Sequence, residues 1–418
     1  MMYKSRHYPT LFEMLALSIL VPPVLAQEAP TGYDPLTNGY LTQQDYNTAS
    51  TIFNRDEVTQ TGLGPVFNDS SCGRCHHGPV LGGDSLVRVL RVGFFDGHVF
   101  SEPPGGSMIP SRATNPKIKA QVPAGVNVQT FRASMSTLGD GYVEAVLDSD
   151  LVNLSTIQST ITGGKIQGKV NWVPVLEFQN ATPAVGRFGW KAQHASLVSF
   201  SADAFRNEMG ITTPLITTEL TSNGRPVDSF EPPGLFANLA NRANNEDVMT
   251  VASFMRSTLA RPRTPGAPPL GPVQGPALKG KAAQIKSGEN VFNSIGCGIC
   301  HTSSLTTAAA GTSVNGGAYL VPPALARVTF HPFGDYLLHD IGTGDGIVQS
   351  GGQETRNLIR TAPLWGLSKR QSFMHDGQST SIVDAIGRHG GEASDVFAKY
   401  QQLGATDQQN LLLFLQSL

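Results

Sequence analysis

Two short segments of the chain carry residue types that attach a redox cofactor covalently. Residues 297–301 read Cys-Gly-Ile-Cys-His, and residues 72–76 read Cys-Gly-Arg-Cys-His. Two thiols three positions apart, followed at once by histidine, form the attachment motif of a c-type haem. The thiols add to the two vinyl groups on one edge of the porphyrin, and the imidazole reaches the iron from one face. The motifs therefore predict two covalent haems, with His76 and His301 as proximal iron ligands.

The two motifs contain every cysteine of the chain, so no thiol remains for a disulfide; these are Cys72, Cys75, Cys297 and Cys300. A thioredoxin-like pair or half of a four-cysteine zinc site would need the thiols alone and would be indifferent to the next residue. Histidine follows in both copies, which favours haem attachment.

Residues 1–26 have the pattern of a secretory signal, with Lys4 and Arg6 before an apolar run and Ala26 at the expected cleavage site. The apolar run is shorter than the about 18 to 20 residues that span a bilayer, so we expect a protein that is not transmembrane. Because c-type haem is attached outside the cytoplasmic membrane, the expected location is the bacterial periplasm. A net charge of −2 with 15% charged residues leaves no basic patch for nucleic acid.

The elements that must position the motifs are expected to form two domains. We predict a mainly α fold with two cytochrome c-like haem domains, residues 27–260 and 281–418, joined by a Pro-rich linker at 261–280. Runs of β-forming residues between about 86 and 178 predict an inserted β-containing region in the first domain. Helical periodicity over 246–259 and 288–295, and a capping-box pattern at Thr406, predict helices that flank the haems.

One further histidine is a candidate iron ligand. His389 follows Ile382, Ala385 and Ile386 on one face of a predicted short helix that ends at two glycines. A histidine there suits an iron ligand, but equally a hydrogen-bonded core residue or one stabilised by the helix dipole. Met374 and His375 are the other ligand candidates, and the residues alone leave these alternatives open.

Beyond the motifs, the chain resembles the bacterial di-haem oxidoreductase family, whose peroxidase-like members are related to the di-haem cytochrome c peroxidases and to MauG. The resemblance covers nearly everything from Gly62 to Leu418. It is clearest in five blocks, which are residues 62–68, 186–192, 335–340, 360–366 and 374–393.

The resemblance implies ligands for the second iron. In the peroxidases, a segment like 374–377 is followed, at the interval where His389 stands, by the distal methionine of the C-terminal haem. Ligation by His301 and His389 is therefore implied, with His375 as a pocket residue. An imidazole in place of a thioether lowers the reduction potential, so electron-storage roles do not transfer unaltered.

The resemblance also implies two catalytic residues. Trp190 stands where the peroxidases carry the tryptophan between their haems, although a lone tryptophan is at least as often a core residue. Glu208 resembles their distal acid, although its interval from Trp190 is two residues shorter than in the peroxidases. It would transfer protons to and from peroxide. An exposed glutamate is the alternative.

Two further expectations concern the first haem and a metal ion. No histidine stands clearly where the peroxidases place the sixth ligand of the first haem, which leaves His77, His98 and His194 and favours a permanently open, MauG-like iron. Asn180, Thr361 and Pro363 resemble interdomain Ca²⁺ ligands, although so few protein oxygens need added waters to hold calcium.

The expected function is that of an oxidoreductase that reacts with peroxide at the first haem and transfers electrons through the second. Its expected partner is a small redox protein that donates or accepts electrons. The alternatives are a non-catalytic di-haem electron carrier with two six-coordinate irons, and a MauG-like or oxygenase-like enzyme that oxidises a protein or organic substrate.

Overall fold

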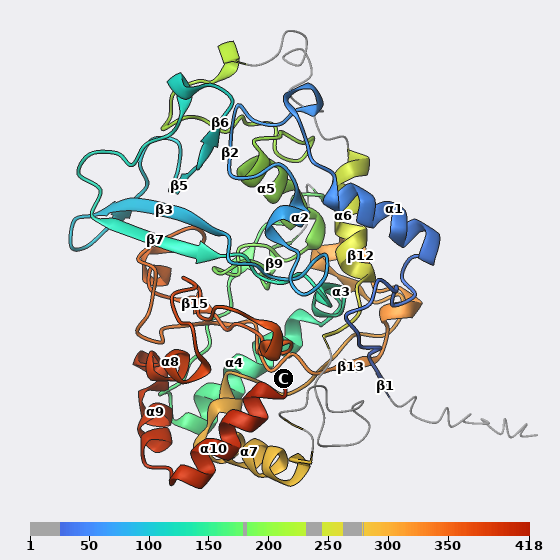
Figure 1. Cartoon of the computed structure of the whole chain (residues 1–418), viewed down its shortest axis with the longest axis vertical. Helices are drawn as coiled ribbons and strands as arrows, with labels where there is room; N and C mark the ends of the chain where they lie inside the picture. Colours follow the sequence, from blue (N-terminus) through green and yellow to red (C-terminus); the bar gives the residue numbers. More distant parts are fainter. Residues whose placement is uncertain (1–25, 179–181, 231–244, 262–277, 279) are drawn as a thin grey trace, which may run out of the picture.

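A computed structural model describes residues 26–178, 182–230, 245–261, 278 and 280–418 (Figure 1). The expected secretory signal, most of the expected Pro-rich linker and Asn180 lie outside these residues. Among the described residues, no helix combines the length and the hydrophobicity that crossing a membrane requires.

Three helices form much of the larger core: α1 (Gln43–Asn54), α5 (Leu197–Met209) and α6 (Asn245–Ser257). Helix α6 buries the face that the sequence periodicity predicts, with Val248, Val251, Ala252 and Met255 all inside the core. Burial of such an apolar stripe is the main reason why a helix of this length is stable in a protein.

A small antiparallel sheet follows the first cysteine motif. Strands β3 (Arg88–Phe95) and β7 (Val128–Ala133) pair along their lengths, from Arg88 opposite Ala133 to Gly93 opposite Val128. Strands β4 (Phe100–Ser101) and β5 (Met108–Ile109) complete the sheet, while β2 (Val66–Phe67) pairs separately with β6 (Arg112–Ala113). Figure 1 shows β3 and β7 projecting together to one side of the molecule.

The predicted β-containing region at 86–178 is only partly correct. Its first half holds the sheet, but α3 (Asp140–Glu144) and α4 (Asp148–Thr162) are helices, and only Trp172–Val173 of its last part forms a strand. Helix α4 is rich in Thr, Ile and Val, whose propensities favour strands. Asp148 and Asp150 in its first turn and the left-handed Gly163 at its end favour the helix instead.

The second core is smaller and lies at the end of the molecule that holds the C-terminal helices (Figure 1). Helix α7 (Ala282–Ile295) packs against the last helix, α10 (Ala405–Gln416). The two backbones approach closely at Gly288, where a Cβ atom would lie 2.0 Å from the carbonyl oxygen of Asn410. Helices α8 (Ile382–Gly387) and α9 (Ser394–Gln401) complete this part.

The two cores do not follow the predicted domain boundary. Many buried residues between 305 and 337 pack with helices α1, α5 and α6 in the larger core. Strand β1 (Gln27–Glu28) also pairs in parallel with β13 (Val328–Phe330), which pairs with β10 (Leu305–Thr306). The first part of the predicted second domain thus packs with the first.

The remaining strands form two-residue pairs in connecting segments. They are β8 (Trp172–Val173) with β9 (Ala184–Val185), β11 (Ser313–Val314) with β12 (Tyr319–Leu320), and β14 (Leu338–His339) with β15 (Ile359–Arg360).

Candidate functional site

The first cysteine motif forms a single helical turn, α2 (Cys72–Cys75). The turn is capped by Ser71, whose hydroxyl oxygen accepts a hydrogen bond from the backbone N–H of Arg74 at 3.3 Å. The N–H of His76 donates to the carbonyl of Cys72 at 2.9 Å, which continues the turn. A side chain three positions along a helix lies on the same face. The two thiols therefore lie side by side, with the imidazole directly after them.

Burial keeps the thiols of this motif protonated. It raises the pKa of Cys72 and of Cys75 to about 12. In the second motif, burial likewise raises the pKa of Cys297 to about 12. Redox-active and metal-binding cysteines have lowered pKa values because the thiolate is the reactive form. The environments thus disfavour the thioredoxin-like alternative, and all four cysteines are free of disulfides.

Each motif lies in the wall of a large cavity. The first cavity has about 1590 Å³ of empty space with its open mouth included, and the second has about 1310 Å³. The first is lined by Cys72, Cys75 and His76, and the second by Cys297, Cys300 and His301.

The second cavity brings two imidazoles together. His301 follows the 3₁₀ turn η5 (Cys297–Ile299), and its Nδ1 lies 3.0 Å from the carbonyl oxygen of Phe333. Nδ1 of His389 lies 2.8 Å from the carbonyl oxygen of Ala385. In each ring Nδ1–H donates to a carbonyl, which leaves Nε2 as the free lone pair, the arrangement usual in metal-binding histidines.

The separation of these rings suits a shared metal ion. Their centroids lie 6.5 Å apart. A ring nitrogen binds a metal at about 2.0 to 2.1 Å, so two imidazoles on opposite sides of one ion have centroids about 6 Å apart. Burial lowers the pKa of both rings, that of His301 to about 4, so both are in the neutral form that a ligand needs.

The donor sets and walls of both cavities fit a haem. Each offers two thiols and an adjacent imidazole, and Nδ1 of His76 is buried without a hydrogen-bond partner. The second cavity is lined mainly by apolar side chains, which suit the porphyrin face. These include Phe292, Ile295, Leu364, Phe373, Ile386 and Leu411.

Trp190 lies between the two cavities and lines both. Only 8% of its surface is exposed, and its indole N–H donates to the carbonyl of Ala133 at 2.8 Å. On the side of the second cavity its ring meets that of His375 edge-on, with centroids 6.2 Å apart. Its hydrogen bond and its packing hold the indole in one orientation between the cavities.

His375 lines the second cavity but makes no ring contact with His301, whereas His389 does. Burial lowers its pKa, and its Nδ1 is buried without a hydrogen-bond partner. Met374, the other candidate ligand, lines both cavities beside Trp190.

Glu208 is half-buried and lines the first cavity from helix α5. Phe200, Ala204 and Glu208 are four residues apart and share the face of α5 that meets this cavity. The side-chain N–H of Asn68 donates to Glu208 Oε2 at 2.8 Å. Burial raises the pKa of Glu208, while Asn68 and Arg91 partly oppose the shift. A carboxyl group with a raised pKa is a stronger base when it is ionised, which suits it to take a proton from a bound substrate.

None of the three remaining histidine candidates is among the described residues that line the first cavity. His77 is exposed, with Nδ1 3.1 Å from the carbonyl oxygen of Arg74, and His98 lies in an exposed loop. His194 is buried, with Nε2 3.2 Å from Asp203 Oδ2.

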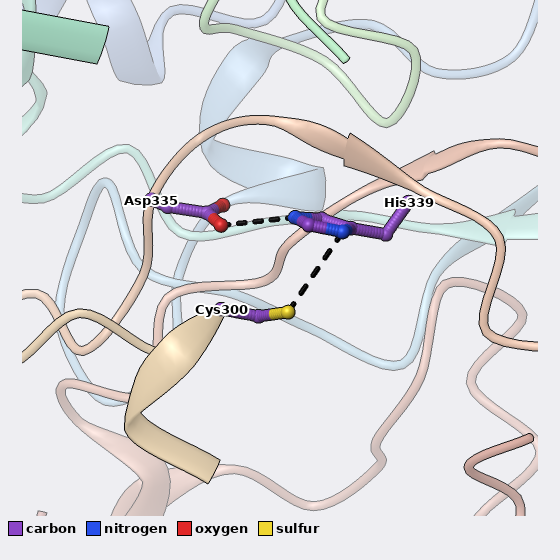
Figure 2. Close-up of side chains that lie close together, drawn as sticks. All are labelled: Cys300, Asp335 and His339. Atoms are coloured by element: carbon purple, nitrogen blue, oxygen red, sulfur yellow. Dashed lines mark hydrogen bonds and ion pairs between the residues drawn. The ribbon is translucent and has the colours of Figure 1, made fainter. Parts of the chain in front are cut away.

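A second group of polar side chains surrounds the sulfur of Cys300, and its geometry superficially resembles a metal site (Figure 2). Nε2 of His339 lies 2.9 Å from Asp335 Oδ2, and its Nδ1 lies 2.9 Å from Glu392 Oε2 and 3.8 Å from Cys300 Sγ. Burial disfavours the imidazolium, but the two carboxylates outweigh it and raise the pKa of His339 well above its usual value. Both ring nitrogens are used as donors, so the ring offers no lone pair to a metal.

Two of the three expected calcium ligands, Thr361 and Pro363, lie among the described residues, and their carbonyl oxygens accept hydrogen bonds from arginines. Arg370 donates to the carbonyl of Pro363 at 2.7 Å, and Arg360 donates to the carbonyl of Thr361 at 3.3 Å. Two guanidinium charges at these oxygens oppose a divalent cation. Calcium is therefore not part of the function proposed below.

The sequence patterns point to neither His339 nor Glu392, and they do not identify the arginines of the first cavity. Asp335, His339 and Glu392 meet only in the fold, although residues 335–340 and 360–366 belong to the blocks that carry the family resemblance.

The solved structures that the chain loosely resembles include the following three. A MauG-like protein associated with microbial copper homeostasis is 13% identical, with 95% of this chain and 94% of that chain covered and a TM-score of 0.39. Hydrazine synthase of Kuenenia stuttgartiensis is 13% identical over 100% of both chains, with a TM-score of 0.41. The diheme peroxidase BthA of Burkholderia thailandensis E264 is 15% identical over 95% of both chains, with a TM-score of 0.41.

These scores are too low to carry an argument about chemistry, and no curated protein matches the chain significantly. A family model gives the assignment instead. The model described as "Di-haem oxidoreductase, putative peroxidase" matches residues 117–418, which is well over half of the chain and includes the second cysteine motif, Trp190 and Glu208. The chain therefore belongs to this family of di-haem oxidoreductases.

Proposed function

We propose that this oxidoreductase is a periplasmic di-haem c-type cytochrome that reduces peroxide in its first cavity and receives electrons through its second. The observation that carries the proposal is the position of Trp190. Its side chain lines two cavities that each have a Cys-x-x-Cys-His motif in the wall.

The cysteine motifs fix the position of each cofactor. Cys72 and Cys75 in the first cavity, and Cys297 and Cys300 in the second, form the thioether bonds. His76 and His301 supply the proximal imidazoles. A haem in the first cavity would supply the iron centre that reduces peroxide by two electrons and is then restored by electrons that arrive one at a time.

The two cavities differ in the residue that lies opposite the proximal histidine. In the second cavity, the ring centroids of His389 and His301 lie 6.5 Å apart, which supports two histidine ligands to one iron and a role in electron transfer. In the first, no histidine other than His76 is among the described lining residues, which supports an open face for the substrate.

Glu208 moves the protons. Reduction of H₂O₂ to two waters consumes two electrons and two protons. The carboxylate of Glu208 takes a proton from peroxide and returns it to the leaving hydroxide, while Asn68 holds it in place through its 2.8 Å hydrogen bond. Trp190 provides the path for the electrons, which come from a small redox protein.

Two measurements on the mature protein test this proposal. Mass spectrometry should show two haems added and the residues before Gln27 missing, and bound zinc in their place would overturn it. An EPR spectrum of the ferric protein should contain one high-spin and one low-spin haem signal. Two low-spin signals without ligand exchange would identify an electron carrier. A high-spin haem that is inert to peroxide but turns over an organic or protein substrate would identify an oxygenase-like enzyme.

A further inference from the structure

Three arginines gather in the wall of the first cavity. Arg261 comes from the segment after α6, Arg360 from strand β15, and Arg370 from the loop after the turn at residues 367–369. Arg261 and Arg360 are each only 5% exposed. Arg360 and Arg370 also line the second cavity, so the group lies where the two cavities adjoin.

Two of these cations lack an anion. Arg261 donates to the carbonyl of Trp365 at 3.0 Å. Arg360 donates to the carbonyls of Gly189 at 2.8 Å and Thr361 at 3.3 Å and to the sulfur of Met135 at 2.8 Å, all of which are uncharged. Within the part of the chain that the structure describes, no carboxylate forms an ion pair with either, and Arg370 has only Asp84 at 4.0 Å. By contrast, buried Arg256 is paired with Glu144 at 2.6 Å. Buried charges in proteins are normally paired, so unpaired guanidiniums indicate a missing anion.

The same place holds polar groups without partners. Nε of Arg261 and the hydroxyls of Tyr33 and Tyr336 are buried and have no hydrogen-bond partner. Tyr33 and Arg261 meet over Gly366, where a Cβ atom would lie 2.6 Å from the Tyr33 hydroxyl and 2.8 Å from Arg261 Cδ. The ring of Tyr336 lies beneath Arg360, whose guanidinium carbon is 5.3 Å from the ring centroid. These groups can donate N–H and O–H bonds to an anion.

Two carboxyl groups lie near this cluster, those of Asp84 and Asp140, and they do not balance its three guanidiniums. Burial raises the pKa of Asp140 to about 7, although Arg261 and Arg360 oppose the shift. Burial lowers the pKa of Arg261 to about 10, which still leaves it cationic at neutral pH. The cluster therefore keeps an excess of positive charge and suits more than one carboxylate.

We propose that Arg261, Arg360 and Arg370, with the hydroxyl of Tyr336, form a carboxylate-binding site that holds the two propionates of the haem attached at Cys72 and Cys75. This inference rests on the haem attachment proposed above. The propionates of a haem lie on the edge away from the vinyl groups, and the cluster suits that edge. Cys72, Cys75, the three arginines and Tyr336 line the same cavity, so a haem attached at the two thiols can present its opposite edge to the arginines.

The test compares the holoprotein with Arg261→Gln and Arg360→Gln. Each substitution should shift the resonance Raman bands of the propionates and lower the midpoint potential of the high-spin haem, because loss of a nearby cation favours the oxidised form. Arg112→Gln is the matched control, since Arg112 is 52% exposed and lies outside the cavity lining. It removes the same charge near the first motif and should leave the propionate bands unchanged.

Conservative variants keep the test decisive if a glutamine variant does not fold. Arg261→Lys retains the charge but loses the forked donor, so it should shift the propionate bands and nearly preserve the potential. Unchanged propionate bands in Arg261→Lys and in every glutamine variant that folds would overturn the inference.

Two other results distinguish this inference from a binding site for a soluble acid and from a failure of the proposed function. A small organic acid is the other source of carboxylate. Suppose that added acetate perturbs the high-spin haem in the dialysed parent but not in Arg261→Gln, and that the substitutions leave the propionate bands unchanged. The site then binds a soluble acid, and the inference is wrong. A mature parent protein that lacks the first haem would instead overturn the proposed function. Haem content shows this without any arginine variant.

Discussion

The imidazole rings of His301 and His389 lie 6.5 Å apart across the second cavity, and each is oriented by a hydrogen bond between Nδ1 and a backbone carbonyl. Helix α8 ends at Gly387, and the N–H of His389 then donates to the carbonyl of Ile386 at 3.1 Å. The second ring is thus positioned by a helix end rather than by a flexible loop, which favours a permanent iron ligand.

The first prediction follows from this pair. His389→Ala should open the second iron and give a high-spin, ligand-binding haem in place of a low-spin one, as read by absorption and EPR spectra. His375→Ala is the control, because His375 lines the same cavity without contact to His301. If His375→Ala opens the iron and His389→Ala does not, residues 374–377 supply the ligand instead.

Glu208→Gln keeps size and packing but removes proton transfer, which contributes about 10² to 10⁴ in rate. Stopped-flow mixing with peroxide should show a loss of that order with unchanged haem spectra. Because burial raises the pKa of Glu208, the parent's rate should fall as the pH drops through that raised value, and the variant should lose this dependence. Glu177→Gln is the control. The Glu177 carboxylate accepts a hydrogen bond from the hydroxyl of Ser199 and does not line the cavity, so this variant should react with peroxide like the parent. Equal rates for Glu208→Gln and the parent would make Glu208 a structural carboxylate.

Trp190→Phe should slow electron transfer between the haems while haem content and ligation stay the same. Phenylalanine has a smaller ring that is harder to oxidise, and it cannot replace the indole hydrogen bond to Ala133. The rate at which a reduced second haem delivers its electron after peroxide is added measures the effect. Trp172→Phe, on a side chain that is 55% exposed, serves as the comparison. An undiminished rate in Trp190→Phe would exclude the indole as the path.

His339→Gln should destabilise the protein, since it leaves buried Asp335 and half-buried Glu392 without their shared cation. Breaking such a buried pair costs about 3 to 5 kcal/mol, which denaturant unfolding can measure. His331, whose ring lies 3.0 Å from exposed Glu28, is the matched control, and His331→Gln should cost about 1 kcal/mol or less. A cost for His339→Gln as small as that of the control would show that the cluster adds no stability.

The same cluster predicts how stability depends on pH. The pKa of His339 is raised in the folded state, so its contribution is complete below about pH 6.5, its unfolded value, and is lost as the pH rises through the folded value. The pKa of Asp335 is lowered, so its contribution is complete above about pH 3.9 and is lost as the pH falls through its folded value. The loss of stability at alkaline pH should disappear in His339→Gln. If the variant still loses stability there, another group is responsible.

Removal of divalent cations should have no effect. Guanidiniums already occupy the carbonyl oxygens of Thr361 and Pro363, so dialysis against a chelator should leave the haem spectra and the melting temperature unchanged. A lower melting temperature that added Ca²⁺ restores would show that the ion displaces Arg360 or Arg370 from these oxygens.

Local patterns in the chain suffice for the parts of the site that lie within a few residues of one another. Cys72 and Cys75 are three positions apart, so a single helical turn such as α2 places both thiols on one side. The apolar period of α6 likewise predicts the face that is buried. These features depend on hydrogen bonds and packing within one or two turns, so a short sequence determines them.

Helix α4 marks the limit of such patterns. Its Thr, Ile and Val residues favour strands locally, and the helix forms because its ends are favourable and Leu151 and Gln158 are buried. Gln158 donates to the carbonyl of Ile299 at 2.9 Å and to Asp335 at 2.6 Å, contacts that no local propensity can anticipate. The boundary between the cores was not predictable either, since β1 pairs with β13 from the far side of the linker.

The sequence by itself determined where the proposed attachment sites lie, because covalent attachment needs only adjacent thiols and an imidazole. Only the tertiary structure decided what surrounds them: it brought His389 opposite His301, placed Trp190 in the walls of both cavities, and gathered Arg261, Arg360 and Arg370 in the wall of the first. The physical reason is that these contacts join segments far apart in the chain. Their distances depend on how the two cores close around the cavities rather than on the spacing of residues along the sequence.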